Sequence, residues 1–187
     1  MTEQSPLYVI DPETLREVAT DPARIQSLLN QTSQELDAAQ RVALLRIGGR
    51  LEEAELLALT QLDGPSGVEK LVRQPREASS SQARWLLRLA TVWQWQGAYS
   101  RADECYGAAL ECFTATTEPA DPRTYAMDVA FAYQHYGKSL FEQGHYREAE
   151  SCFAQAESLR RAHGAPQEMI DSSVLALRAT RRRRANL

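Results

Sequence analysis

The chain has 187 residues, of which 43% are hydrophobic and 25% are charged, an ordinary composition for a globular domain. Its formal net charge of −4 argues against a domain that wraps nucleic acid, because such domains are normally basic. No apolar run approaches the roughly 18–20 residues that span a bilayer, and a signal peptide is not evident. Three cysteines without a Cys-x-x-Cys pair do not suggest a disulfide framework, so we expect a reduced, cytoplasmic protein.

The N-terminal part predicts short helices that follow a tail or extended lead-in over residues 1–10. Aspartate followed by proline offers an N-cap and a first helical residue, and this pair occurs twice, which predicts helices near 12–19 and 22–30. Thr32 stands three residues before Glu35, as in a capping box, and predicts a helix that runs to about Ile47. No segment alternates with period two over a useful length, so no strand is predicted.

The remaining helices are bounded by capping residues, glycines and prolines. Asp63-Gly64-Pro65 ends one of them, Ser79–Ser81 and Ser100 are candidate N-caps, and Gly164 is a candidate left-handed residue after a C-terminus. The predicted ranges are about 51–62, 66–73, 82–96, 100–114, 122–143 and 146–162, with a last helix from Pro166 and a loop over 116–120.

The chain also repeats itself. The stretch Gly97–Leu110 recurs 47 residues later as Gly144–Glu157, with Gly, Tyr, Ala, Cys, an aromatic residue and Ala at the same offsets, and a weaker copy starts at Gly49. Internal repeats of this length indicate stacked helical hairpins, in which each unit buries its apolar surface against its neighbours. Small residues on both helices of a hairpin would let the helices approach closely.

These residues resemble the signature of the tetratricopeptide repeat. The central copy matches it at Leu86, Leu89, Ala90, Trp93, Gly97, Tyr99, Ala102, Tyr106 and Ala109. The next copy matches at Tyr133, Tyr136, Gly137, Leu140, Gly144, Tyr146, Ala149, Phe153 and Ala156. The period exceeds the usual 34 residues, and Thr114 and Arg161 replace the closing proline. The longer helices resemble the extended repeats of kinesin light chains and bacterial peptide-sensing regulators.

The resemblance covers about residues 36–162 and implies an all-α fold within a single domain over 1–187. The fold would be a solenoid of antiparallel helix hairpins, with about three repeats, N-terminal helices and a C-terminal capping helix. The repeats would span about 33–62, 82–114 and 122–162, and the capping helix about 166–184.

Such repeats bind peptides or proteins on a concave face lined by their first helices. Position by position, the resemblance places on this face Arg84, Leu87, Thr91, Gln94, Trp95, Phe131, Gln134, Lys138, Phe141 and Glu142. Trp95 and Phe141 would be the apolar anchors, because buried aromatic residues dominate interface energies. Two alternatives stay open: the N-terminal helices fold back into the groove, or the same surface forms a homodimer.

One specialised version of this face is not supported by the sequence. Members that clamp a C-terminal carboxylate use Lys, Asn and Arg on successive repeats, whereas this chain has Ala39 and Ala43 in the first repeat and Arg88 in the second. Arg84 and Arg88 could still hold an acidic group, since arginine offers a two-pronged donor. The alternative is that they lie along a solvated face.

Other reactive residues have ordinary explanations. Cys105 and Cys152 occupy equivalent repeat positions and, with Cys112, suit packed helix positions as small apolar residues. The three histidines lack metal-ligand spacing, so we predict no metal and no cofactor. The run Arg181–Arg184 is the only hint of nucleic acid, and cations at a helix C-terminus or a solvated tail explain it as well.

The sequence therefore predicts a non-enzymatic protein–protein interaction scaffold, with no catalytic residues and no membrane segment. The alternatives are a regulatory or sensor module that binds a peptide or small ligand, and a self-associating dimer.

Overall fold

A computed structural model describes residues 6–31, 36–115 and 121–186, and this part of the chain is almost entirely helical. The helices are α1 (Pro22–Asn30), α2 (Ala38–Ile47), α3 (Leu51–Thr60), α4 (Gly64–Arg73), η1 (a 3-10 turn, Pro75–Glu77), α5 (Ser80–Trp95), α6 (Tyr99–Ala115), α7 (Pro122–Glu142), α8 (Tyr146–Ala162) and α9 (Gln167–Ala185). The all-α class predicted from the sequence is confirmed.

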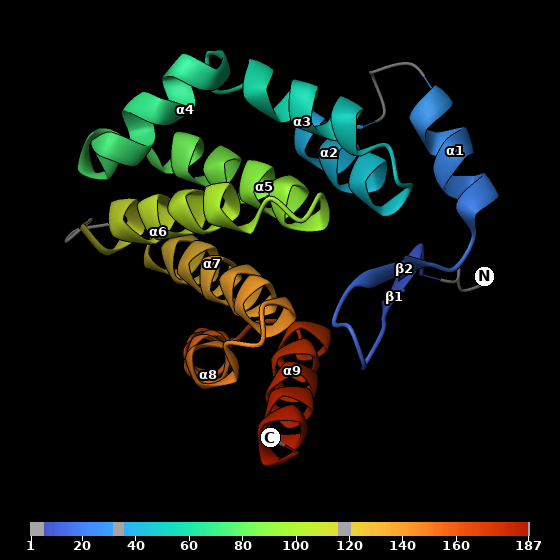
Figure 1. The fold of residues 1–187 in the computed structure, drawn as a ribbon, viewed down its shortest axis with the longest axis vertical. Coiled ribbons are helices and arrows are strands. Elements are labelled where there is room, and N and C mark those ends of the chain that lie inside the picture. The colour runs from blue at the N-terminus through green and yellow to red at the C-terminus, as the bar shows by residue number, and fades with distance from the viewer. Residues whose placement is uncertain (1–5, 32–35, 116–120, 187) are drawn as a thin grey trace.

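The helices from α2 to α9 follow one another around an arc, and the N-terminal segment lies on its inner side (Figure 1). Neighbours in the chain pack against each other, above all α5 on α6, α7 on α8 and α8 on α9. The predicted ends of most of these helices agree with the structure to within a few residues, and α8 spans the predicted residues. Among the residues described, no helix is both long and apolar enough to cross a bilayer.

The predicted N-caps are partly confirmed. The carboxylates of Asp21 and Asp121 accept hydrogen bonds from the first turns of α1 and α7, and Ser79 forms a capping box at α5. Ser100 is not a cap, because α6 already begins at Tyr99. At α2 the capping box is formed by Asp37 and Gln40 instead. The box predicted at residues 32–35 and the loop at 116–120 lie outside the described residues.

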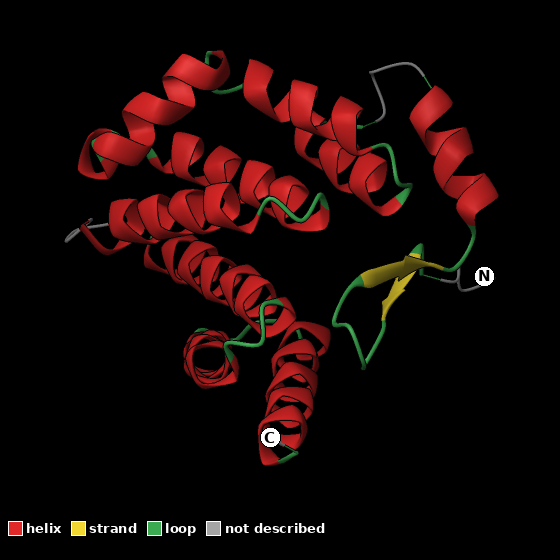
Figure 2. Ribbon diagram, viewed as in Figure 1, coloured by secondary structure: helices red, strands yellow, loops and turns green. Residues whose placement is uncertain are grey.

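The absence of strands and the helix near 12–19 are corrected by the structure. Residues Tyr8–Ile10 (β1) and Glu17–Ala19 (β2) form an antiparallel pair in which Val9 faces Val18 (Figure 2). The segment between them is a turn, in which the Asp11 amide donates to the Arg16 carbonyl over 2.9 Å. Strands of three residues are too short for an alternating pattern to be recognised, which is why the sequence missed them.

Small residues sit where the helices approach most closely. Ala90, Ala102, Ala149 and Ala156 are fully buried, as the repeat pattern predicts. A Cβ atom on Gly137 would lie 2.7 Å from the ring of Phe153, so α7 and α8 pack through this glycine.

Equivalent turns join α5 to α6 and α7 to α8. Gly97 and Gly144 adopt φ angles of 77° and 81°, a left-handed conformation that glycine reaches without steric cost. The two best repeat copies therefore also share the geometry of their turns.

Candidate functional site

The inner face of the arc carries the residues that the sequence proposes for binding, but much of it is already covered. Leu87, Gln94 and Gln134 are buried, so the expectation that these three face an open groove is corrected, whereas Thr91 is 5% exposed and borders a hollow between α2, α5 and α7. Gln94 accepts a hydrogen bond from the Tyr106 hydroxyl over 2.8 Å. The polar side chains of this set form hydrogen bonds with residues of α6, α8 and α9, so they lie within the packed helix layer.

Residues 11–17, which form the turn between β1 and β2 and the first residue of β2, lie on this face. Leu15 is 1% exposed and packs with Leu140 and Phe141 of α7 and with residues of α8 and α9. Its backbone φ is 60°, a region that bulky residues rarely adopt, so the tertiary packing of Leu15 compensates for local strain. Phe141, predicted as an open anchor, is therefore buried beneath the chain's own Leu15.

Glu17 forms the centre of a buried ion cluster. Its carboxylate accepts from the Lys138 ammonium over 2.8 Å and from the Arg46 guanidinium over 2.9 Å. All three side chains are less than a tenth exposed. Lys138, predicted to meet a partner, thus meets a carboxylate of its own chain.

Arg16 makes the next contact. Its guanidinium grips the Glu142 carboxylate with two hydrogen bonds of 2.8 and 2.7 Å, and Tyr99 and Gln94 also donate to this carboxylate. Two guanidinium groups contact Trp95, with Arg16 at 5.3 Å and Arg46 at 4.5 Å from its ring centre. The predicted residues Trp95 and Glu142 are consequently brought together by a segment that the sequence did not connect with them.

Phe131 and Arg84 lie beyond the turn. Arg84 forms a two-pronged pair with Asp128, with hydrogen bonds of 2.6–2.9 Å. Phe131 is half-buried, packs against the tilted ring of His135 with the ring centres 4.1 Å apart, and lines a hollow of about 300 Å³ between α2, α5 and α7. Other residues of this hollow are Asp37, Ala39, Gln40, Val42, Ala43, Arg46, Arg88 and Thr91. This is the part of the face that the N-terminal turn leaves open.

The C-terminal arginines are held by carboxylates on neighbouring segments. Arg181 and Arg184 pair with Glu150 of α8, and Arg182 and Arg183 pair with Glu13 of the turn. The run belongs to α9 and is not a detached tail. Pairing offsets much of its charge, and surface pairs of this kind contribute little to stability, about 0–1 kcal/mol each.

The cysteines are separate from this face. None is in a disulfide, and burial raises the pKa of Cys105 to about 12 and that of Cys152 to about 11. Their thiols are therefore protonated at neutral pH and behave as small apolar groups. A search of the described ranges finds no cluster of His, Cys, Asp or Glu that could hold a metal ion.

The electrostatics of the face predict acid sensitivity. Burial alone would raise the pKa of Glu17, but Lys138 and Arg46 outweigh it and hold this pKa well below its ordinary value of 4.5. Burial, reinforced by Lys138, Arg46 and Arg160, lowers the pKa of His135 well below 6.5. The folded protein thus binds fewer protons at both groups than the unfolded chain does.

Stability should accordingly fall as the pH drops below about 6.5, and further below about 4.5. Linkage limits the loss to about 1.4 kcal/mol per pH unit for each group. The melting temperature of the wild type and of His135→Gln, measured between neutral and acidic pH, tests this. His135→Gln should lose the decline in melting temperature below about pH 6.5 and keep the decline below about pH 4.5. A pH profile identical to that of the wild type would contradict the role of His135.

Sequence reasoning missed Leu15, Arg16 and Glu17 as residues of this face. The only available signal is weak: two short runs, Tyr8-Val9-Ile10 and Glu17-Val18-Ala19, flank an Asp-Pro turn. Comparison with protein-family models gives no match to the chain, and comparison with curated proteins gives none either.

Proposed function

We propose that this chain is a non-enzymatic protein-interaction scaffold of the tetratricopeptide-like type, working in the cytoplasm. It would be a solenoid of about three helix hairpins that binds a peptide or protein segment on the face formed by α2, α5 and α7. The buried small residues of the repeats and the equivalent turns at Gly97 and Gly144 support this assignment. The N-terminal turn would then be an internal occupant of the binding face.

The observation that carries the proposal is the way residues 15–17 lie on the helices. Leu15 inserts an apolar side chain, Glu17 supplies a carboxylate to Lys138 and Arg46, and Arg16 reaches Glu142. Apolar anchors combined with charge-assisted hydrogen bonds are the means by which peptides are held in helical grooves. A partner segment would compete with this turn and extend into the hollow beside Phe131.

Competition with the N-terminal turn should set the affinity of the chain for its partner. A tethered segment acts at an effective concentration near millimolar, and a partner binds only the fraction of molecules whose face is free. Weakening the turn should therefore strengthen partner binding, whereas a merely structural turn would give no such gain.

Selection from a random peptide library on the immobilised full chain tests the proposal. Enriched peptides should bind in solution, compete with a synthetic peptide of residues 6–20, and lose affinity for Trp95→Ala. Leu56→Ala is the control, because Leu56 of α3 is 68% exposed and lies outside the hollow beside Phe131. The proposal fails if no peptide is enriched, or if the selected peptides bind Trp95→Ala as well as the wild type.

Arg16→Ala gives a quantitative form of the same test. Loss of its pair with Glu142 should reduce the free energy that holds the turn on the face by about 1 kcal/mol. A selected peptide should then bind about fivefold more tightly. Arg76→Ala removes a surface pair with Glu111, away from this face, and should leave the affinity unchanged. Light scattering on the same samples shows whether a second copy of the chain takes the place of the peptide.

A further inference from the structure

A second cavity lies between α4 and the hairpin of α5 and α6. It has a volume of about 540 Å³ and is lined by Pro65, Val68, Glu69, Val72, Arg73, Trp93, Arg101, Glu104 and Cys105. Small-molecule sites in proteins typically have volumes of about 300–1,000 Å³. Trp93 points away from the peptide face, since residues two positions apart on a helix, such as Thr91 and Trp93, lie on nearly opposite sides.

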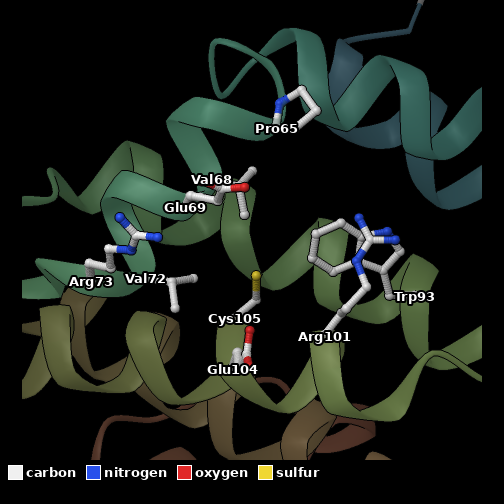
Figure 3. A pocket seen from close by; sticks show the side chains of 9 residues that line it. All are labelled: Pro65, Val68, Glu69, Val72, Arg73, Trp93, Arg101, Glu104 and Cys105. Atoms are coloured by element: carbon white, nitrogen blue, oxygen red, sulfur yellow. The ribbon is translucent and has the colours of Figure 1, made fainter.

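The floor of this cavity is apolar and uncharged. Val68, Trp93 and Cys105 are each at most 5% exposed, and the Cys105 sulfur points from α6 toward α4 (Figure 3). The Trp93 indole N–H already donates to Glu55 over 2.8 Å, so the part of its ring that Arg101 leaves uncovered offers only an apolar surface. Because burial raises the pKa of Cys105 to about 12, this thiol is neutral as well. The floor suits an aromatic or branched apolar group.

The rim carries charges of both signs. Arg73 and Arg101 stand on opposite sides of the cavity, with Glu69 on α4 and Glu104 on α6 between them (Figure 3). Within residues 6–31, 36–115 and 121–186, none of the ion pairs involves Glu69, Arg73 or Glu104. The Arg101 guanidinium lies 3.8 Å from the centre of the Trp93 ring, and its long ion pair with the Glu55 carboxylate measures 3.9 Å.

We propose that this cavity binds a small zwitterionic molecule with an apolar side chain, of the amino-acid class. Its apolar part would rest on Trp93, Val68 and Cys105, its carboxylate would meet an arginine of the rim, and its ammonium group a glutamate. A ligand that carries only a positive or only a negative charge would be repelled by two of the four charged rim residues and attracted by the other two. The site is independent of the peptide face and goes beyond the proposed scaffold function.

Calorimetric titration of the full chain with four matched probes tests this inference. L-Phenylalanine carries both charges and an aromatic group, phenethylamine only the cation, 3-phenylpropionate only the anion, and glycine lacks the apolar group. Phenylalanine should bind with a dissociation constant of about millimolar, and roughly tenfold tighter than each other probe. No binding of phenylalanine, or equal binding of the three aromatic probes, would overturn the proposal.

Two variants locate the site. Val72→Trp should fill the cavity and abolish binding, and Arg73→Ala should weaken it about tenfold by removing a charge-assisted hydrogen bond. Arg73 is exposed, so its variant remains informative even where Val72→Trp fails to fold. Lys70→Ala is the control, because Lys70 lies on the same helix but does not line this cavity. Phenylalanine binding that neither variant changes would place the ligand elsewhere and overturn the assignment.

Discussion

Glu17→Ala should lower the free energy of unfolding by about 3–5 kcal/mol, because it leaves Lys138 and Arg46 as buried charges without their carboxylate. Both cations are nearly inaccessible to water, and the cost of an uncompensated buried charge exceeds the net value of the pair. Urea denaturation followed by circular dichroism measures the change, with the slope of the transition as a check on two-state behaviour.

Two further variants separate this cause from a general effect of altering the turn. Glu13→Ala removes exposed pairs with Arg182 and Arg183 and should cost no more than about 1 kcal/mol. Lys138→Met in the Glu17→Ala background removes one of the stranded charges and should restore part of the lost stability. Equal losses for Glu13→Ala and Glu17→Ala would contradict the buried cluster as the cause.

Leu15→Ala is expected to destabilise the protein by about 2–5 kcal/mol, since it empties a fully buried position between α7, α8 and α9. Leu56→Ala is the matched control: Leu56 is 68% exposed, and its truncation should change stability by less than about 0.5 kcal/mol. The same denaturation experiment compares them. A loss below about 1 kcal/mol for Leu15→Ala would mean that the turn contributes little packing energy.

Glu17→Ala and Leu15→Ala should also change peptide binding. Either change frees the face that residues 11–17 cover, so peptides selected on the wild type should bind the surviving folded molecules more tightly. Hydrogen exchange would then report faster exchange in β1 and β2 than in α5 and α7, because the turn opens locally before the helices unfold.

Much of the fold could be predicted from the sequence, because it depends on local signals. Capping residues such as Ser79 and Asp121, the glycines at 97 and 144, and the spacing of Ala90 and Ala102 specify helices, their ends and their close packing. One boundary error falls at Asp63-Gly64-Pro65, which follows α3 and also supplies the N-cap and the first two residues of α4.

The candidate site could be predicted only in part. The resemblance to the tetratricopeptide repeat placed Trp95, Lys138, Phe141 and Glu142 on one predicted face. It could not foresee that Leu15 and Glu17 cover them, because those contacts join residues more than 120 positions apart, as from Glu17 to Lys138. Nor does periodicity reveal the cavity beside Trp93, whose shape depends on how far α4 stands from α6.

By itself, then, the sequence determined the helical class, the paired helices and the repeat at Gly97–Leu110 and Gly144–Glu157, since local backbone and packing preferences recur with the sequence. Only the tertiary structure decided which side chains remain accessible. The sequence around the two three-residue strands and Leu15 has too little local pattern to predict where this segment lies. Its position follows from the burial of Leu15 and from the pairing of the Glu17 carboxylate with Lys138 and Arg46.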